Sequence, residues 1–584
     1  MIEREDLGDG ILLLRLNVPG ATANVLSRAV NVAFAEAVGA ALTDGAVAGA
    51  VIASGKADFV TGGDLDELRR LASPQEAAAL VGPMLATLRR METAGKPVVA
   101  ALNGSALGGG LEIALACHRR IAADNPAARF GLPEATLGLM PGAGGTQRLP
   151  RLIGIDRAAP LLLEGRGLVA AEALKLGILD AVVPPGDLMA AAKAWALANP
   201  TASQPWDRKG FVAPGFHPQS PEGRQFFTAS WPRYRRKGGA HDPAAAAILQ
   251  VLHHGMERAI DPALAIETRH FARVAASVEA KNKIRTLFYA AKDARARRRP
   301  DGKPSQPPAR LGIVGGGQMG CGIAFAALRA GMAVALLDVS AERAQAAHAA
   351  VARIVARETE RGRLDAAAGE ALLARLAVGT DYALIGKADL VVEAVFERRD
   401  LKREVLAKVA QAAPGAVIAS NTSTIPIAGL AEALPEPANL LGLHFFSPVE
   451  RMELVEAIRA PATSDAAFGA GLDLVRALRK TPVAVNDGLG FFTSRVVTNY
   501  TTEALTLLAE GVPAQLIDNV AIAAGMPIGP CAMADLTSLT LLADIVASMR
   551  GDGRRTAYLG IRAEEALARL AAAERRGSAA DAGI

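Results

Sequence analysis

The stretch "LGIVGGGQMGCG", Leu311 to Gly322, decides the fold of the second half of the chain. It begins as an apolar strand and continues with Gly315, Gly317 and Gly320 in the spacing G-x-G-x-x-G. Glycines at this spacing let a backbone approach a pyrophosphate at the N-terminus of a helix, where the helix dipole favours negative charge. The stretch therefore predicts a dinucleotide-binding turn.

The residues that follow this turn complete a βαβ unit. The helical pattern "CGIAFAALRAG" comes first, and the strand pattern "AVALLDVS" then contains Asp338, 18 residues after Gly320. A carboxylate at this point accepts the ribose hydroxyls of adenosine and repels a 2′-phosphate, which favours NAD over NADP. Further strands are expected over residues 388–395, 416–423, 439–448 and 452–458.

A histidine and a glutamate on the last two of these strands are candidates for proton transfer. His444 ends one strand and Glu456 lies in the next, so a hairpin could bring the two side chains together. A histidine held by a carboxylate can take a proton from a hydroxyl group while the carbon gives a hydride to NAD. From the residues alone, a purely structural histidine is an equal alternative.

Glycine-rich segments of a different kind occur in the first half. In "NGSALGGGLEIALACH" (103–118) the acid, Glu112, lies in the expected helix itself, so this is not a dinucleotide turn. Amides at such a helix start can hold a developing oxyanion. The segment "RFGLPEATLGLMPGAGGTQRLPRLIG" (129–154) places Glu134 in a turn. Two glutamates near amide-rich corners suit proton transfer on a thioester, although by the pattern alone each glutamate is more often a helix cap or a solvated residue.

Length and composition limit the classes of protein. A chain of 584 residues is too long for one core, and a net charge of +5 is too small to indicate a nucleic-acid partner. No apolar run of about 18 residues suggests a membrane span, and the N-terminus lacks the apolar segment of a secretory signal. Cys117, Cys321 and Cys531 lie far apart, without metal-ligand or disulfide spacing. We therefore expect a cytoplasmic protein without a metal site.

The second half resembles the 3-hydroxyacyl-CoA dehydrogenase family. The resemblance rests on "GIVGGGQMG", "VVEAVFERRDLK", "ASNTS", "GLHFFSPVERMELVE", "GFFTSR" and "GMPIGP". It implies His444 as the catalytic base and Glu456 as its orienting partner. It also implies a substrate-binding role for Ser423 and Ser494.

The same resemblance implies a set of cofactor-binding residues. These are Gly315, Gly317, Met319, Gly320, Asp338, Glu397, Lys402 and Ser447. Two positions depart from the family pattern, because Ser447 and Ser494 stand where many relatives carry asparagine. Serine keeps a hydroxyl donor and acceptor but has a shorter reach, so the contacts at these two positions are in question.

The first half resembles the crotonase (enoyl-CoA hydratase/isomerase) family. The matching segments are "FVTGGDL", "NGSALGGGLE", "GLPEATLGLMPGAGGTQRLPRLIG" and "GLVAAEALKLGILDAVV". The resemblance implies that the amides of Val60 and Gly109 form an oxyanion hole. It also implies that Glu112 and Glu134 hold the attacking water and deliver the proton to C2. Because both glutamates are present, hydration is favoured over isomerisation alone.

The order of the two halves is similar to that of the multifunctional fatty acid oxidation proteins of the alpha-subunit type. The resemblance implies an α/β multidomain fold in four parts. These are a crotonase-like ββα superhelix domain (1–190), a helical bridging segment with a basic, proline-rich linker (191–309), an NAD-binding Rossmann domain (310–486) and an all-α dehydrogenase domain that lacks a second helical repeat (487–584).

The function that follows is a bifunctional enzyme of fatty acid β-oxidation. It would hydrate a trans-2-enoyl-CoA and oxidise the resulting 3-hydroxyacyl-CoA with NAD. The alternative is a non-catalytic or singly active acyl-CoA-binding subunit of a β-oxidation complex. A thiolase subunit is a possible partner. Apolar residues at helical spacing over 490–511 and 516–529 favour a homodimer, unless the 550–584 tail folds back over them as a single helix.

Overall fold

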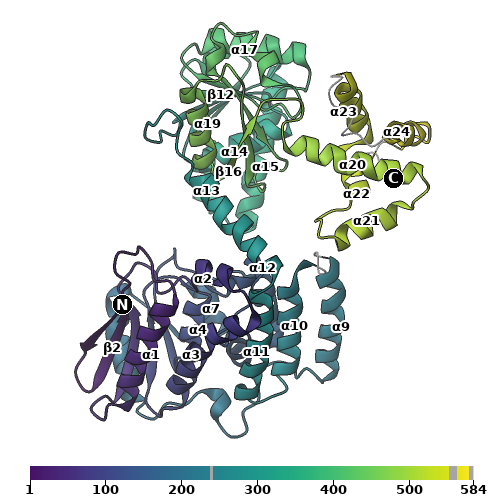
Figure 1. Cartoon of the computed structure of the whole chain (residues 1–584). Helices are drawn as coiled ribbons and strands as arrows, with labels where there is room; N and C mark the ends of the chain where they lie inside the picture. The colour runs from purple at the N-terminus through teal and green to yellow at the C-terminus, as the bar shows by residue number, and fades with distance from the viewer. Residues whose placement is uncertain (237–240, 552–561, 576, 578–582) are drawn as a thin grey trace. The chain divides into compact units, whose positions relative to one another are not determined.

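The computed structural model describes residues 1–236, 241–551, 562–575, 577 and 583–584. The chain divides into two compact units (Figure 1). The first is Met1–Tyr289 with Ala521–Pro527, and the second is Ala290–Val520 with Ile528–Ile584. A search of the described helices finds none with the length and apolar character needed to cross a membrane.

The first unit is built on a six-stranded sheet in the order β1-β2-β3-β4-β6-β8. Only β1 runs antiparallel to its neighbour, and β5 and β7 form a separate parallel pair. The strands are β1 (Ile2–Asp6), β2 (Ile11–Leu16), β3 (Gly49–Ser54), β4 (Val98–Leu102), β5 (Ala106–Leu107), β6 (Arg119–Ala123), β7 (Phe130–Gly131) and β8 (Ala181–Val183).

Helices cover both faces of this sheet, which explains why its central strands are apolar throughout. They are α1 (Arg28–Thr43), α2 (Leu65–Arg70), α3 (Pro74–Thr93), α4 (Gly109–Ala116), α5 (Gly145–Ile153), α6 (Ile155–Glu164), α7 (Ala170–Leu176), α8 (Leu188–Ala198), α9 (Pro221–Arg236), α10 (Pro243–Gly255), α11 (Ile260–Ala275) and α12 (Val278–Lys283). Side chains alternate along a strand, so Ile52 joins the core under α1 and α3 while Val51 packs under α8.

Part of the segment expected to be a bridge belongs to the core of the first unit. Helices α10 and α11 pack against each other and against α5, and α11 also packs along α3 (Figure 1). Ile248, Leu252 and Phe271 from these helices lie in the same hydrophobic cluster as the sheet residues. Residues of α11 can therefore reach the interior of the first unit.

The second unit contains an eight-stranded sheet in the order β11-β10-β9-β12-β13-β14-β15-β16. All neighbours are parallel except β14 and β15. The strands are β9 (Arg310–Val314), β10 (Ala333–Leu337), β11 (Leu376–Gly379), β12 (Leu390–Glu393), β13 (Val417–Ser420), β14 (Leu440–Phe445), β15 (Leu454–Arg459) and β16 (Thr481–Asn486). The helices between them are α13 (Ala291–Ala296), α14 (Gln318–Arg329), α15 (Ala341–Glu360), α16 (Ala366–Leu373), α17 (Arg399–Ala412), α18 (Ile427–Ala431) and α19 (Asp465–Ala477).

The chain ends in a helical part, as expected. It comprises α20 (Thr493–Ala509), α21 (Ala514–Ala523), α22 (Pro530–Thr537), α23 (Leu539–Gly551) and α24 (Ala563–Ala572). Helices α22 and α24 both pack against α20, and Leu505 and Leu567 share one hydrophobic cluster there. Helix α24, in the tail of the chain, therefore covers part of α20. Residues 552–561, 576 and 578–582 lie outside the described residues. The mixed α/β fold class is confirmed.

Two candidate active sites

The first candidate site surrounds the glycine turn before α4. Gly108 has a φ of +53°, and a β-carbon there would lie 2.7 Å from Oε1 of Glu134. A β-carbon on Gly110 would lie 2.4 Å from the Val60 carbonyl oxygen, so α4 begins directly against the Val60 backbone. Gly109 is the first residue of α4, and no side chain caps this helix end. The structure thus brings both expected oxyanion positions to one turn.

The two glutamates flank this same turn. Glu112 lies on α4 and is 3 % exposed, and its Oε1 accepts hydrogen bonds from the amides of Ala143 (2.7 Å) and Gly145 (2.8 Å). Its Oε2 lies 3.9 Å from the place of a β-carbon on Gly109. Glu134 lies on a 3₁₀ turn (Pro133–Leu137), and its buried Oε2 has no hydrogen-bond partner among the described residues. This oxygen of Glu134 is therefore available to a ligand.

The two carboxyl groups differ in their electrostatic surroundings. Burial raises the pKa of Glu112, while the amides of Gly145 and Ala143 oppose this shift. Burial raises the pKa of Glu134 well above its ordinary value, and the negative charge of Glu112 raises it further. Glu112 is consequently better suited to be a carboxylate base, and Glu134 to be a protonated acid.

A third buried carboxylate belongs to this site and was missed from the sequence. Glu267 of α11 is 0 % exposed and accepts hydrogen bonds from the amides of Gly144 (2.6 Å) and Thr146 (3.0 Å). The signal that could have identified it is its place on an apolar stripe with Leu264 and Phe271 at helical spacing. A carboxylate on such a stripe must have polar partners within the core.

The second candidate site contains the expected histidine–glutamate pair. His444 on β14 and Glu456 on β15 stand directly opposite each other in the antiparallel ladder. Nδ1 of His444 lies 2.8 Å from Oε2 of Glu456, which is fully buried. The Thr493 amide donates to Oε1 (2.9 Å), and the Thr493 hydroxyl donates to Oε2 (2.8 Å). A carboxylate at Nδ1 favours the tautomer that leaves Nε2 as a proton acceptor.

The charge of Glu456 is favoured by its partners. Burial alone would raise the pKa of Glu456, but hydrogen bonds from His444 and from the Thr493 amide and hydroxyl outweigh burial and lower it. Glu456 is thus an anion over the neutral pH range and can stabilise a positive charge on His444.

The glycine turn of the second unit fits a dinucleotide. Gly315 has a φ of +111°, and a β-carbon there would lie 2.5 Å from the Ala394 carbonyl oxygen. Gly317 is the N-cap of α14, and a β-carbon on it would meet nothing within 4 Å, so this side of the turn is open. Oδ2 of Asp338 accepts a hydrogen bond from the Gly316 amide (2.9 Å). An open helix N-terminus next to a carboxylate suits the pyrophosphate and ribose of NAD.

The remaining expected cofactor residues of this turn lie at the same place. Met319 and Gly320 belong to the first turn of α14, and a β-carbon on Gly320 would lie 1.9 Å from the Gly315 carbonyl oxygen. The Ser447 hydroxyl accepts a hydrogen bond from the Gln318 side chain (3.0 Å). Ser447 is therefore held against the N-terminus of α14, next to the open side of the turn.

Arg343 is an unexpected partner of Asp338. Its Nε donates to Oδ1 of Asp338 (3.1 Å), and the Arg343 side chain is about half exposed. A cation beside this carboxylate compensates part of its charge, which affects how strongly the site distinguishes NAD from NADP.

Glu397 and Lys402 support the segment that carries Ser423. Oε1 of Glu397 accepts hydrogen bonds from the amides of Ser423 and Thr424 (2.9 Å each). Lys402 is 0 % exposed, and its ammonium group lies 2.8 Å from Glu393 and 3.4 Å from Glu397. Lys402 was expected to bind the cofactor, but its burial leaves it in contact with Glu397 and Glu393 and without an exposed surface.

Ser423 and Ser494 are brought together. The Ser494 hydroxyl donates to the Ser423 carbonyl oxygen (3.0 Å), which ties α20 to the end of β13. The Ser423 hydroxyl lies 3.3 Å from Oε1 of Glu397. Both serines thus belong to one connected group with Glu397.

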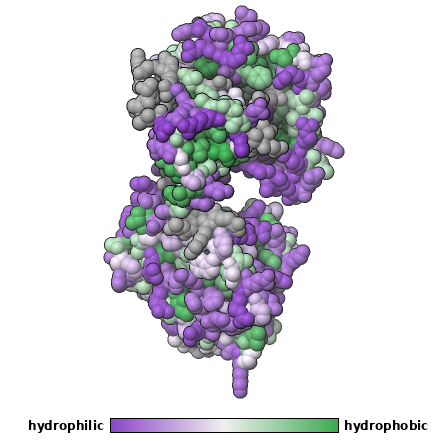
Figure 2. Space-filling view, turned by 90° about the vertical axis from the view of Figure 1, so that its right-hand side faces the viewer, coloured by the Kyte–Doolittle hydropathy of each residue, from purple (hydrophilic) through white to green (hydrophobic). Residues whose placement is uncertain are grey.

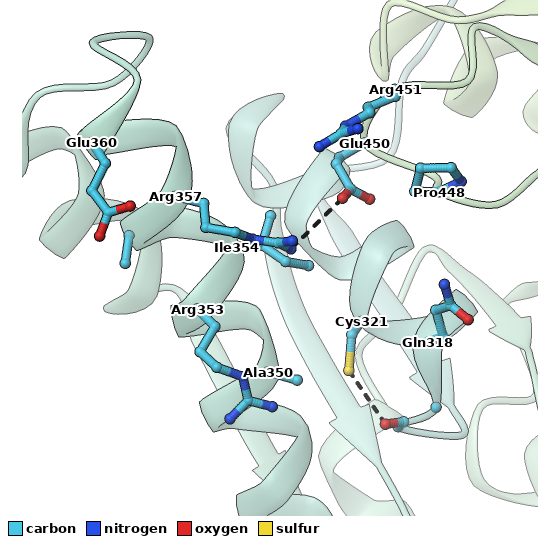
Figure 3. Close-up of a pocket in the computed structure, with 13 residues that line it drawn as sticks. Gln318, Cys321, Ala350, Arg353, Ile354, Arg357, Glu360, Pro448, Glu450 and Arg451 are labelled. Atoms are coloured by element: carbon cyan, nitrogen blue, oxygen red, sulfur yellow. Dashed lines mark hydrogen bonds and ion pairs between the residues drawn. The ribbon is translucent and has the colours of Figure 1, made fainter. Parts of the chain in front are cut away.

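A cavity of about 770 Å³ lies beside the glycine turn (Figure 3). Gln318 and Cys321 line it from α14, and Arg353 and Arg357 line it from α15. Its remaining labelled residues in Figure 3 are Ala350, Ile354, Glu360, Pro448, Glu450 and Arg451. Arg357 points toward Glu450 (3.8 Å). Arg353 and Arg357 lie four residues apart on α15, and this spacing is the sequence pattern that could have indicated a basic surface here.

Comparison with known proteins gives the family. The family model of the enoyl-CoA hydratase/isomerase domain matches residues 6–205. The models of the 3-hydroxyacyl-CoA dehydrogenase NAD-binding and C-terminal domains match residues 310–488 and 490–584. The fatty acid oxidation complex subunit alpha of Shewanella baltica is 35 % identical over 545 residues, which are 92 % of this chain and 76 % of that protein. The chain belongs to the fatty acid oxidation complex alpha-subunit family.

A second member of this alpha-subunit family, from Shewanella loihica, is 36 % identical over 544 residues, which are 92 % of this chain and 76 % of that protein. Among solved structures, a (S)-3-hydroxybutyryl-CoA dehydrogenase from Ralstonia eutropha is 32 % identical, with a TM-score of 0.45 over 47 % of this chain and 98 % of that one. An enoyl-CoA hydratase subunit I from Geobacillus kaustophilus is 28 % identical, with a TM-score of 0.32 over 52 % and 98 %.

The alpha-subunit family and its domain composition establish the class of activity. The chain fuses an enoyl-CoA hydratase domain with a 3-hydroxyacyl-CoA dehydrogenase domain. It is a bifunctional enzyme of fatty acid β-oxidation with lyase and NAD-dependent oxidoreductase activities.

Proposed function

We propose that the two sites act in sequence on one acyl-CoA. Glu112 and Glu134 hydrate a trans-2-enoyl-CoA to (3S)-3-hydroxyacyl-CoA, and His444 with Glu456 then serves the oxidation to 3-oxoacyl-CoA. The observation that carries this proposal is that one chain holds two pairs of side chains suited to proton transfer. Glu112 and Glu134 flank the glycine turn before α4, and His444 is hydrogen-bonded to Glu456 on the neighbouring strand. We propose that residues 1–190, together with the part of residues 191–309 that packs into the core of the first unit, carry the hydration, and that residues 310–584 carry the oxidation.

The hydration step uses the contrast between the two glutamates. The Glu112 carboxylate takes a proton from water while the water oxygen bonds to C3. The electron pair of the double bond forms a new C2–H bond with the proton of Glu134. During the reaction negative charge develops on the thioester oxygen, and the Val60 and Gly109 amides stabilise it.

The oxidation step uses the histidine–glutamate pair. Nε2 of His444 takes the proton of the 3-hydroxyl group, and Glu456 stabilises the imidazolium that forms. NAD, when bound, supplies the acceptor for the hydride that leaves C3. Ser423 and Ser494 bind the acyl-CoA, and Glu397 keeps Ser423 in place.

The cavity beside the glycine turn suits phosphate groups. Arg353, Arg357 and Arg451 place three guanidinium groups around it, with Glu450 engaged by Arg357. Guanidinium groups bind phosphates through paired hydrogen bonds. We propose that this cavity receives phosphates of the nucleotides that NAD and coenzyme A carry.

The experiment that tests the function is the formation of NADH from crotonyl-CoA and NAD by the purified protein alone. We expect NADH to form because the first site makes the 3-hydroxyacyl-CoA that the second site oxidises. The alternative is a non-catalytic or singly active subunit. NADH from added 3-hydroxybutyryl-CoA but not from crotonyl-CoA would leave only the dehydrogenase active. No NADH from either substrate would mean an inactive dehydrogenase, and the loss of crotonyl-CoA absorbance would then separate an active hydratase from a binding subunit.

The choice of cofactor gives a second prediction. The Asp338 carboxylate would stand close to the 2′-phosphate of NADP, so we expect oxidation with NADP to be at least about 10-fold slower than with NAD at the same low concentration. In the Asp338→Ala variant, Arg343 is freed to pair with that phosphate, and the ratio of the rate with NAD to the rate with NADP should become smaller. Initial rates of oxidation with each cofactor give this ratio. Equal rates in the unsubstituted enzyme would remove Asp338 from the cofactor site.

Apolar surface on the helical part supports pairing of two chains. Five apolar residues among those described there are more than half exposed, namely Phe492, Val496, Leu516, Val520 and Leu536. Figure 2 shows hydrophobic residues among hydrophilic ones on this side of the molecule. Monomeric proteins rarely expose extended apolar patches, so we propose an isologous homodimer through residues after about 490.

Light scattering tests the homodimer over micromolar concentrations. We expect a mass near twice 60.3 kDa. The double variant Val496→Ser with Val520→Ser should shift the mass toward the monomer. A monomeric mass with full NAD-dependent activity in the unsubstituted protein would rule the dimer out and leave α24 as the cover of α20.

The product of the second site indicates that a further protein acts on it. A 3-oxoacyl-CoA is the substrate that a thiolase cleaves, and the relatives are named as one subunit of a complex. We propose that this chain assembles with a thiolase subunit in the cytoplasm.

A further inference from the structure

The loop that leads into α5 anchors the base of the hydration site. The amides of Ala143 and Gly145 both donate to Oε1 of Glu112. This leaves Oε2 of Glu112 directed to the glycine turn, 3.9 Å from the place of a β-carbon on Gly109. The orientation of the Glu112 carboxyl group therefore depends on the position of this loop.

The alternate amides of the same loop donate to Glu267. The Gly144 amide donates to Oε1 (2.6 Å), and the Thr146 amide donates to Oε2 (3.0 Å). The Thr146 hydroxyl makes a further short hydrogen bond to Oε2. Four successive amides are thus divided between two buried carboxylates, and one of these carboxylates comes from a helix more than 100 residues away in sequence.

The loop lies directly on α11. A β-carbon on Gly142 would lie 2.5 Å from the Phe271 ring, and one on Gly144 would lie 3.1 Å from Leu264. Gly144 also has a φ of +100°, a conformation that other residues rarely adopt. This close packing prevents the loop from moving closer to α11.

A buried cation completes the arrangement. Arg148 is 0 % exposed, and it donates to the Ala143 carbonyl oxygen (2.7 Å) and to Glu92 (2.6 Å). Burial raises the pKa of Glu267 to about 8, with the negative charge of Glu112 adding to the effect and Thr146, Gly144 and Arg148 opposing it. Burying a carboxyl group here lowers the stability of the folded chain. Destabilising features of this kind are found mainly where the group has a function.

We propose that Glu267 is a positioning residue of the hydration reaction. It acts through the 143–146 loop, which holds Oε1 of Glu112 so that Oε2 faces the substrate. The inference rests on the proposed role of Glu112 as the base. It also assigns a catalytic consequence to α11, which lies outside residues 6–205 matched by the hydratase family model.

The Glu267→Gln variant tests this role. Glutamine keeps the size of the side chain, but its amide nitrogen would face either the Gly144 or the Thr146 donor, so one anchor is lost. We expect kcat for hydration of crotonyl-CoA to fall about 10–100-fold, because a displacement of about 1 Å can cost two orders of magnitude. The KM for crotonyl-CoA should change less than about threefold, because the substrate-binding groups are untouched. Oxidation of added 3-hydroxybutyryl-CoA should be unchanged.

Three further variants serve as controls for this test. Glu279→Gln changes an exposed glutamate on α12 and should leave hydration unchanged. Thr146→Val removes the hydroxyl bond to Glu267, together with the bond that this hydroxyl accepts from the Gln147 side chain (3.2 Å), and should lower kcat severalfold. Thr146→Ser keeps both bonds and should retain kcat. If Glu267→Gln does not fold, as judged by its thermal transition, the comparison of Thr146→Val with Thr146→Ser decides the question.

A double substitution separates this inference from the proposed function. In the Glu112→Gln background, Glu267→Gln should cost less than about twofold, because its effect passes through Glu112. Equal losses in both backgrounds, or an unchanged kcat in the single Glu267→Gln variant, would overturn the positioning role. If Glu112→Gln itself kept full hydration activity, the proposed base would be wrong, whatever Glu267 does.

Discussion

The His444→Gln variant is expected to lose oxidation of 3-hydroxyacyl-CoA by about 10²–10⁴-fold. Glutamine can still donate a hydrogen bond to Glu456, which lies 2.8 Å from the His444 ring, so the hairpin should keep its form. It cannot accept the proton of the hydroxyl group. The buried Glu456 anion then has no imidazolium to stabilise. NADH formation from added 3-hydroxybutyryl-CoA measures the loss.

Hydration of crotonyl-CoA by the same variant should be unchanged, since the Glu112 site lies in the first unit. His348→Gln provides a matched control, because His348 lies half-buried on α15 in the second unit. It should retain both activities. A loss of hydration together with oxidation in the His444 variant would contradict two separate sites.

The Glu112→Gln variant is expected to show the reverse pattern, with hydration reduced by about 10²–10⁴-fold. The glutamine oxygen can accept the Ala143 and Gly145 hydrogen bonds, so the loop should stay in place. Its amide group would then face the substrate in place of a carboxylate oxygen. It cannot take a proton from water. Loss of the crotonyl-CoA absorbance measures hydration directly.

Oxidation of added 3-hydroxybutyryl-CoA should be nearly unchanged in this variant. Glu164→Gln, which alters an exposed glutamate of α6, is the matched control and should keep both activities. Equal loss of both reactions in the Glu112 variant would show that one site serves both chemistries, which would overturn the proposed sequence of steps.

Much of the second site could be predicted because its parts are local in sequence. The glycine turn and Asp338 belong to one βαβ unit, and the Gly316–Asp338 hydrogen bond joins them as that pattern implies. His444 and Glu456 are only 12 residues apart on neighbouring strands, so the register of one antiparallel pair places them opposite each other. Local periodicity is sufficient for such arrangements.

Other features depend on the burial of a side chain, which cannot be predicted from a local sequence pattern. Lys402 was expected to bind the cofactor, but its ammonium group is enclosed by Glu393 and Glu397. Arg343 was not expected at Asp338, because a half-exposed arginine on a helix has many possible partners. The unpartnered oxygen of Glu134, and with it the contrast between the two glutamates, likewise appears only when neighbouring atoms are placed.

The sequence by itself determined the fold class, the two chemistries and the identity of the four proton-transfer residues proposed for them. Only the tertiary structure shows that the loop holding Glu112 also binds Glu267, which lies 123 residues beyond Gly144. Contacts at that separation are set by how α11 packs against α3 and α5. Packing of this kind depends on the shapes of many side chains at once, whereas a turn or a hairpin depends on a few neighbouring residues.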